Sequence, residues 1–196
     1  MPLPRSPVRR KLVGIAIILY VLGFAAGLCI HRYSPDLSDK LYDQMVASFR
    51  AEFEGLDKAL PIYTKIFTHN LSISAIMAFA GVVFAIPPVF ILIANGIPLG
   101  LILARSERPV IVVLGSILPH GIFELPATFL AGAFGMLLGL DAAALISGWM
   151  KGQGEVPTRI LVSDVKKVLG WFLLVAVLLA IAAAIETLLF LWYSSA

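Results

Sequence analysis

Cysteine and charged residues are the scarce components of this sequence. Its 196 residues include a single cysteine, Cys29, which excludes an intramolecular disulfide and a metal site built from cysteines. Charged residues make up 14% of the chain and hydrophobic residues 60%, and no lysine or arginine interrupts the long apolar runs. Such runs are long enough to cross a bilayer, which takes roughly 20 residues. The sequence therefore predicts an integral membrane protein.

Motifs of enzymes and of nucleic-acid-binding proteins are also missing. The sequence has no H-E-x-x-H pair of histidines, no paired aspartates for an intramembrane protease and no glycine-rich phosphate loop. Its basic clusters adjoin apolar runs, where membrane topology explains them better than nucleic acid does. We therefore expect a protein that is not an enzyme and binds no nucleic acid. The expected partners are membrane lipids and a second copy of the chain or another membrane protein.

The distribution of apolar runs predicts an all-α fold: a polytopic α-helical integral membrane bundle with broken or re-entrant helices. We expect about five crossings, because breaks and polar turns divide the apolar sequence into about that many segments. Composition separates a basic cytoplasmic tail, a first transmembrane helix, an extracytoplasmic amphipathic helical segment and a core membrane bundle. The boundaries of these four regions are residues 1–11, 12–30, 31–68 and 69–196.

Basic residues set the expected orientation in the cell membrane. The tail before the first apolar run is basic, which favours a cytoplasmic N-terminus by the positive-inside rule. The same rule places a turn at residues 105–108 and a polar loop at residues 147–167 in the cytoplasm. We interpret residues 71–104 as one long broken crossing and residues 110–146 as a hairpin, so that the C-terminus lies outside.

The segment after the first span has the periodicity of a helix. Apolar residues from Leu41 to Leu60 recur at spacings of three or four, which predicts an amphipathic helix that begins after Pro35 and ends before Pro61. Such a helix lies on the membrane surface or packs on the bundle. Two interpretations stay open: the helix covers its own bundle, or it forms a docking surface for a partner.

Prolines and glycines mark the expected breaks and contacts of the core bundle. A proline inside a helix removes one backbone hydrogen bond and favours a break. The prolines expected to interrupt helices are Pro87, Pro88, Pro98, Pro119 and Pro126. Small residues spaced by four allow two helices to approach closely. The glycines expected at such contacts are Gly23, Gly27, Gly135 and Gly139.

Two ionisable residues lie in the apolar stretch between Pro119 and Pro126. Charge at membrane depth is costly, so ionisable residues there are functional candidates by default. His120 and Glu124, with Gly121 between them, are four residues apart and share one face if the helix is continuous. Three roles stay open: ligands of a divalent cation, a proton or ion relay, and a structural hydrogen-bonded pair.

The last apolar run contains a further acidic residue, Glu186, that has no basic neighbour in its own segment. A carboxylate in hydrocarbon stays protonated or finds a partner on another helix. We therefore expect Glu186 to complete a buried polar cluster with His120 and Glu124. The other residues expected in this cluster are His69, Asn70 and Asn95.

The combination of these residues resembles the stage II sporulation protein M family of multi-pass membrane proteins. The most specific match is one element, Pro119-His120-Gly121-Ile122-Phe123-Glu124-Leu125-Pro126. Less specific matches are His69-Asn70, Gly81, Asn95-Gly96, Gly100 and Glu186. The resemblance covers roughly residues 65–192. The preceding part of the chain matches only in its general plan, a first span followed by a polar region.

This resemblance implies a membrane protein whose function has two interpretations. In spore-forming bacteria the namesake of the family is a membrane scaffold for peptidoglycan-degrading partners, but the family also occurs in archaea, which have no murein. The first interpretation is a non-enzymatic scaffold or assembly protein with a buried His/Glu site. The alternative is a transporter or channel subunit that moves protons, ions or a small solute past His120, Glu124 and Glu186. A divalent cation at His120 and Glu124 is the one cofactor to consider.

Overall fold

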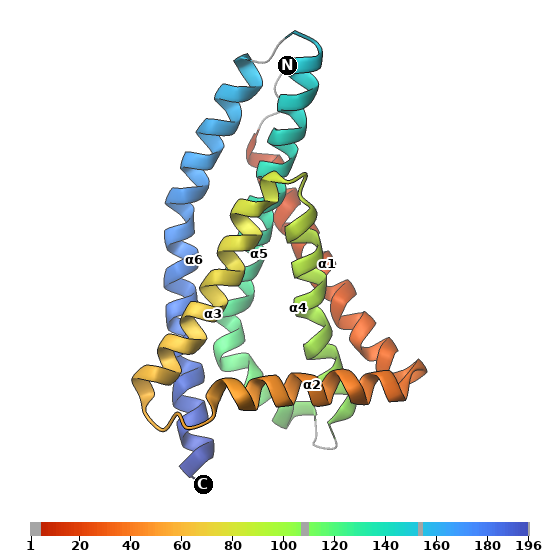
Figure 1. Cartoon of the computed structure of the whole chain (residues 1–196), viewed down its shortest axis with the longest axis vertical. Helices are drawn as coiled ribbons and strands as arrows, with labels where there is room; N and C mark the ends of the chain where they lie inside the picture. Colours follow the sequence, from red (N-terminus) through yellow and green to blue (C-terminus); the bar gives the residue numbers. More distant parts are fainter. Residues whose placement is uncertain (1–4, 107–109, 153–154, 196) are drawn as a thin grey trace.

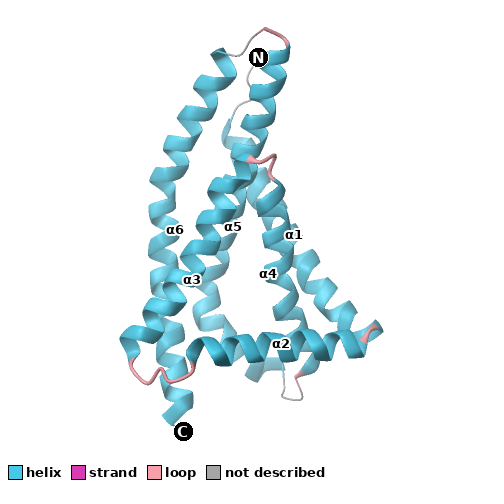
Figure 2. Ribbon diagram, in the orientation of Figure 1, coloured by secondary structure: helices cyan, strands magenta, loops and turns pink. Residues whose placement is uncertain are grey.

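The computed structural model describes residues 5–106, 110–152 and 155–195, and the regular structure in these ranges is helical (Figures 1 and 2). The elements are α1 (Arg5–Tyr33), α2 (Pro35–Phe53), α3 (Ala59–Phe79), the short 3-10 helix η1 (Ala80–Val82), α4 (Ile86–Arg105), α5 (Val110–Met150) and α6 (Glu155–Ser195). The predicted all-α bundle is thus confirmed. Residues 1–4 of the predicted tail and residues 107–108 of the predicted turn lie outside the described ranges.

Among the described residues, four helices are long and apolar enough to cross a membrane: α1, α4, α5 and α6. Together with α3, an apolar helix of 21 residues, they give about five passes along the bundle, which agrees with the predicted number. The helices α5 and α6 have 41 residues each. At a rise of 1.5 Å per residue each is about 60 Å long, roughly twice the thickness of the hydrocarbon core.

The bundle has two distinct ends (Figure 1). At one end α2 lies across the other helices, and the C-terminus lies on this side; we call it the α2 end. At the opposite end lie the N-terminus, the last turn of α5 and the first turn of α6; we call it the N-terminal end. The two termini are therefore at opposite ends of the bundle, as the sequence predicts.

Arg105, at the end of α4, lies at the α2 end, opposite the N-terminus. The prediction that the turn beginning at Arg105 shares the side of the basic tail and of residues 147–167 is therefore wrong. Arg105 donates a hydrogen bond to Asp39 and lies 4.0 Å from a carboxylate oxygen of Asp43, and both acids belong to α2. Its guanidinium also lies 4.6 Å from the ring centroid of Tyr42. Acidic residues of the same surface compensate the charge of Arg105, so this arginine alone is a weak signal of topology.

The chain reverses direction between α3 and α4, where we predicted one long broken crossing. Phe84 and Ala85 have positive φ angles of 51° and 61°, a backbone conformation that residues other than glycine rarely adopt. Pro87 and Pro88 follow in the first turn of α4, where a proline is tolerated because it needs no hydrogen bond from its nitrogen. These two prolines mark a break as predicted, and at this break the chain reverses its direction.

The predicted breaks at the other prolines are wrong. Pro98 lies inside α4, and Pro119 and Pro126 lie inside α5, which is one continuous helix. A proline removes one backbone donor and leaves one carbonyl group without its usual partner. In an apolar bundle the remaining backbone groups still need internal hydrogen bonds, and neighbouring groups can compensate for the missing one. Both helices therefore stay continuous, although proline disfavours the interior of a helix.

Two polar segments are also more helical than predicted. The amphipathic helix ends at Phe53, and α3 begins at Ala59 with Pro61 in its first turn, so this proline starts a helix where we expected an end. Gly55 lies in the connection with a φ angle of +74°. The described part of residues 147–167 is mainly helical: α5 continues to Met150 and α6 begins at Glu155, so these long helices carry most of its polar residues.

Close backbone contact joins α1 to α4. A Cβ atom added to Gly23 would overlap the backbone of Ile93, and one added to Gly27 would overlap the backbone at Ile97. From the other side, Cβ atoms at Gly96 and Gly100 would overlap backbone atoms of α1. The predicted contact glycines of the first span therefore meet a matching pair in α4.

A second close contact joins α5 to the α3–α4 turn. Gly135 lies against the backbone of Met77 and Gly81, and Gly139 lies against the backbone of Ala85. A side chain at any of these glycines would overlap backbone atoms, which cannot move aside as a flexible side chain can. The two contacts fix α4 between α1 and α5 and leave the polar residues of all three helices facing a common space.

Candidate functional site

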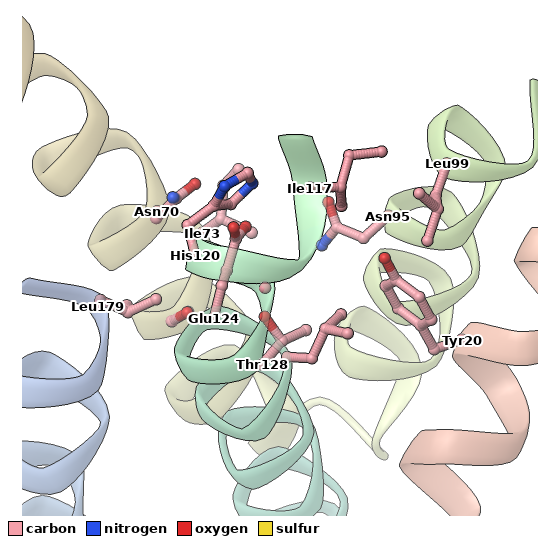
Figure 3. Close-up of a pocket in the computed structure, with 13 residues that line it drawn as sticks. Tyr20, Asn70, Ile73, Asn95, Leu99, Ile117, His120, Glu124, Thr128 and Leu179 are labelled. Atoms are coloured by element: carbon pink, nitrogen blue, oxygen red, sulfur yellow. The ribbon is translucent and has the colours of Figure 1, made fainter. Parts of the chain in front are cut away.

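A cavity of about 110 Å³ lies between α1, α3, α4 and α5, with Leu179 of α6 at its edge. Its polar lining comes from four helices and comprises Tyr20, Asn70, Ser74, Asn95, His120, Glu124 and Thr128. Figure 3 shows His120 and Glu124 on successive turns of α5, with Asn70 on one side of them and Asn95 and Tyr20 on the other. The volume is sufficient for a few water molecules.

The cavity lies deep within the helices that surround it. Asn70, Asn95 and His120 are each about ten residues, or about 15 Å, from the end of their helix on the α2 side. Glu186 lies at a similar distance from the end of α6. About 15 Å is half the thickness of the hydrocarbon core of a bilayer, so a membrane with one face at these helix ends would have its midplane near these residues.

His120, Glu124 and Glu186 form a compact cluster at this level. One potential ligand atom from each residue lies within 4.8 Å of those of the other two, and all three side chains are partly buried. His120 and Glu124 come together because α5 continues through Pro119, so that residues four apart share one face. Glu186 approaches them from α6. The structure thus brings the three predicted ionisable residues together.

The histidine of this cluster has an unsatisfied polar atom. Nδ1 of His120 is buried and has no hydrogen-bond partner among the described residues. An unpaired buried polar group costs free energy comparable to a lost hydrogen bond, and native structures contain few of them. This nitrogen is therefore available to a ligand or a water molecule.

The cluster also has little positive charge nearby. Among the described residues that line the cavity there is no lysine and no arginine, and the other polar groups are neutral hydroxyls and amides. Two carboxylates in a region of low dielectric constant repel each other unless a proton or another cation compensates them. His120 is the one side chain of the cluster that can itself supply positive charge. The arrangement is therefore suited to binding a proton or a metal cation.

The remaining predicted residues differ in their positions. Asn70 and Asn95 line the cavity as expected. His69, in contrast, lies outside the cluster: its side chain is 53% exposed, and its Nδ1 is 3.8 Å from Glu52 Oε1. The prediction that His69 belongs to the cluster is wrong, because adjacent residues of a helix point in directions about 100° apart.

Gly121 has a distinct place in this site. It lines the cavity, and a Cβ atom added there would meet nothing closer than Ile117 Cγ2 at 4.0 Å. This glycine therefore leaves open space, whereas the contact glycines of α1 and α4 are filled by a neighbouring backbone. A small side chain can be introduced at residue 121 without displacing another element.

Sequence reasoning missed three polar lining residues: Tyr20, Ser74 and Thr128. For two of them a signal exists, because Ser74 follows Asn70 by one helical turn and Thr128 follows Glu124 in the same way. Tyr20 has no such neighbour in the first apolar run. It is directed to the cavity by its packing, with its ring in an edge-to-face contact with Phe129 at 5.5 Å.

Comparison with known proteins identifies a family and a relative of this chain. The family model described as Stage II sporulation protein M matches residues 16–189. The chain is also similar to an uncharacterized protein of Methanocaldococcus jannaschii, with 24% identity over 175 residues, which cover 88% of this chain and 89% of that protein. No solved structure matches the chain significantly. The matched region includes every residue of the polar cluster.

Proposed function

This chain belongs to the stage II sporulation protein M family of membrane proteins, and we propose that it is a transporter or channel subunit that moves a proton, an ion or a small solute. The cavity observed between four helices supports this proposal most directly, because it places Glu124 among polar groups from the other helices, with the carboxylate of Glu186 close to that of Glu124. Polar and ionisable groups are costly in this position and are characteristic of ion and solute pathways.

The alternative role, a non-enzymatic scaffold, makes a different demand on the structure. A scaffold needs stable helices and an accessible surface, but it needs no water-accessible route to Glu124. A transporter or channel needs such a route from at least one side of the membrane. Accessibility of the cavity to a water-soluble reagent therefore separates the two functions.

The test uses single cysteines in a Cys29→Ser background. Gly121→Cys places a thiol at the cavity, where there is room for it, and Ile122→Cys serves as the matched control because Ile122 is 63% exposed on the surface of the bundle. In sealed vesicles we expect a charged, membrane-impermeant thiol reagent to modify Gly121→Cys and not Ile122→Cys, because a lipid-facing thiol is shielded. Protection of Gly121→Cys from both sides would favour the scaffold.

We also propose that the N-terminal end of the bundle faces the cytoplasm. The described basic residues of that end include Arg10, Lys11, Lys151 and Arg159, next to few acids. At the α2 end basic and acidic residues alternate, as in the pairing of Arg105 with α2. A cysteine at Ser106 should therefore be labelled from outside the cell and one at Gly152 from inside. The reverse pattern would contradict this orientation.

A further inference from the structure

We propose that His120, Glu124 and Glu186 bind a divalent transition-metal ion. The inference rests on the proposed function only in treating this ion as the transported species. The binding site itself follows from the geometry, the charge and the unsatisfied nitrogen of the three residues.

The geometry of the cluster is close to that of a metal site. The potential ligand atoms lie within 4.8 Å of one another, whereas the ligands of a tetrahedral zinc ion, bound at about 2.0–2.2 Å, are about 3.4 Å apart. The difference is within the reach of side-chain rotation, since each glutamate has three rotatable side-chain bonds. His120 and Glu124 are held one turn apart on α5, so the required movement falls mainly on Glu186 of α6.

The charge of the cluster matches a divalent ion. With both carboxylates ionised and the imidazole neutral, the three residues carry two negative charges. A divalent cation neutralises this set, and the described lining of the adjoining cavity offers no lysine or arginine that would do so. In the low dielectric of a membrane interior, a neutral assembly is strongly favoured over an uncompensated pair of carboxylates.

The unsatisfied nitrogen provides a further, independent observation. His120 Nδ1 is buried without a hydrogen-bond partner within the described ranges, although buried polar atoms are normally paired. A neutral imidazole offers one nitrogen with a free lone pair, which is the form that binds metals. Water molecules in the adjoining cavity can complete the coordination, as in metal sites that keep an open position.

The types of ligand restrict the choice of ion. One imidazole nitrogen with two carboxylates suits Zn²⁺, Mn²⁺ or Fe²⁺, whereas Mg²⁺ and Ca²⁺ prefer sites made of oxygen atoms alone. A copper(I) site would require sulfur ligands, and Cys29 is exposed on α1. We therefore expect a preference for Zn²⁺ or Mn²⁺ over Mg²⁺.

The experiment measures metal binding by the full-length chain, purified in detergent and freed of metal with a chelator. Titration calorimetry with Zn²⁺, Mn²⁺ and Mg²⁺ should give one saturable site for the first two ions and weak or no binding of Mg²⁺. Zn²⁺ should also raise the melting temperature, because a ligand bound by the folded state stabilises it. Absence of saturable binding of both transition ions would overturn the proposal.

Variants locate the site. Glu186→Gln and His120→Ala should each weaken Zn²⁺ binding by about tenfold or more, since each removes one of three ligands. The matched control is the surface pair His69 and Glu52, which has the same residue types at 3.8 Å. His69→Ala and Glu52→Gln should change the affinity less than about twofold, which is within ordinary surface effects. Loss of binding in the surface variants alone would contradict the assignment.

A spectroscopic measurement avoids dependence on the folding of the variants. In the Cys29→Ser protein, Co²⁺ bound by an imidazole and two carboxylates in a site of low coordination number absorbs visible light more strongly than hydrated Co²⁺. Zn²⁺ should displace the bound Co²⁺ and so abolish this absorption stoichiometrically. An unchanged spectrum of hydrated Co²⁺ in the presence of the protein would contradict the site.

The outcomes for the site and for the proposed function are distinguishable. Metal binding together with a protected Gly121→Cys means that the ion is structural and that the transporter proposal fails. An accessible Gly121→Cys without metal binding means that the metal proposal fails while transport of a proton or a solute stands. Accessibility and binding together support both.

Discussion

The two faces of α4 differ in how the space beside them is filled. Gly96 and Gly100 face α1 in backbone contact, whereas Asn95 and Leu99, each one residue earlier, line the cavity. One face is filled completely because it has no side chains, and the other leaves space that polar groups surround. The comparison indicates that the cavity depends on the glycine contact, which holds α1 and its Tyr20 at a fixed distance.

Changes in the glycine contact between α1 and α4 should cause the largest loss of stability. Gly23→Val places a branched side chain against the backbone of Ile93, and we expect a loss of about 3 kcal/mol or more in the free energy of unfolding. Gly14→Val is the control in the same helix, because a Cβ atom there meets nothing within 4 Å. Reversible unfolding in detergent measures both, and equal losses would show that the contact is not what holds α1.

The ionisable residues that line the cavity, His120 and Glu124 of α5, should be energetically coupled. His120→Ala and Glu124→Gln should each lower stability by about 1–2 kcal/mol, and the double variant should cost about 1 kcal/mol less than their sum. The coupling arises because each single change leaves the partner in place without its neighbour. His69→Ala combined with Glu124→Gln should be additive, since His69 lies outside the cluster. Additivity of both double variants would mean that His120 and Glu124 do not interact.

Removing a polar group from the cavity face of α4 should raise the stability of the protein. Asn95→Leu replaces an amide in the cavity with an apolar side chain, and we expect a gain of about 0.5–1 kcal/mol in stability. The same change should reduce modification of Gly121→Cys, because it fills space beside it. Leu99→Asn on the same face is the contrasting variant and should lower stability. A loss of stability in Asn95→Leu would show that this amide is fully satisfied in the native protein.

The smallest effect is expected at the α2 end. Arg105→Ala removes the ion pairs to Asp39 and Asp43, but these carboxylates are 59% and 72% exposed. Exposed pairs contribute at most about 1 kcal/mol, and salt reduces the contribution further. Chemical denaturation at low and high ionic strength should therefore show a small loss that shrinks with salt. A loss that is independent of salt would point to the packing of Arg105 on Tyr42 instead.

The sequence predicted the fold class and the ionisable part of the candidate site because both depend on local patterns. The apolar runs specify membrane helices, and the spacing of His120 and Glu124 brings them to one face of any continuous helix. The approach of Glu186 was expected because an isolated carboxylate needs a partner. Its position beside α5 nevertheless depends on helix packing, which no single segment encodes.

The failures of prediction have a common physical cause. Whether a proline ends a helix depends on how the freed carbonyl group is compensated, and this is a property of the surroundings of Pro119 and Pro126 rather than of the local sequence. The reversal at Phe84 and Ala85 uses positive φ angles at residues that rarely adopt them. Tyr20 was missed because its place in the cavity is set by the contact of α1 with α4.

The length of α5 and α6 has a mechanical consequence. Glu186 lies about 45 Å along α6 from Glu155, and His120 and Glu124 lie in the corresponding part of α5. If one of these long helices rotates by about 3° about its end, a residue about 45 Å away along it moves by about 2 Å. A force applied to the last turn of α5 and the first turn of α6, at the N-terminal end, would thus widen or narrow the distance between the carboxylates of Glu124 and Glu186 without any local rearrangement.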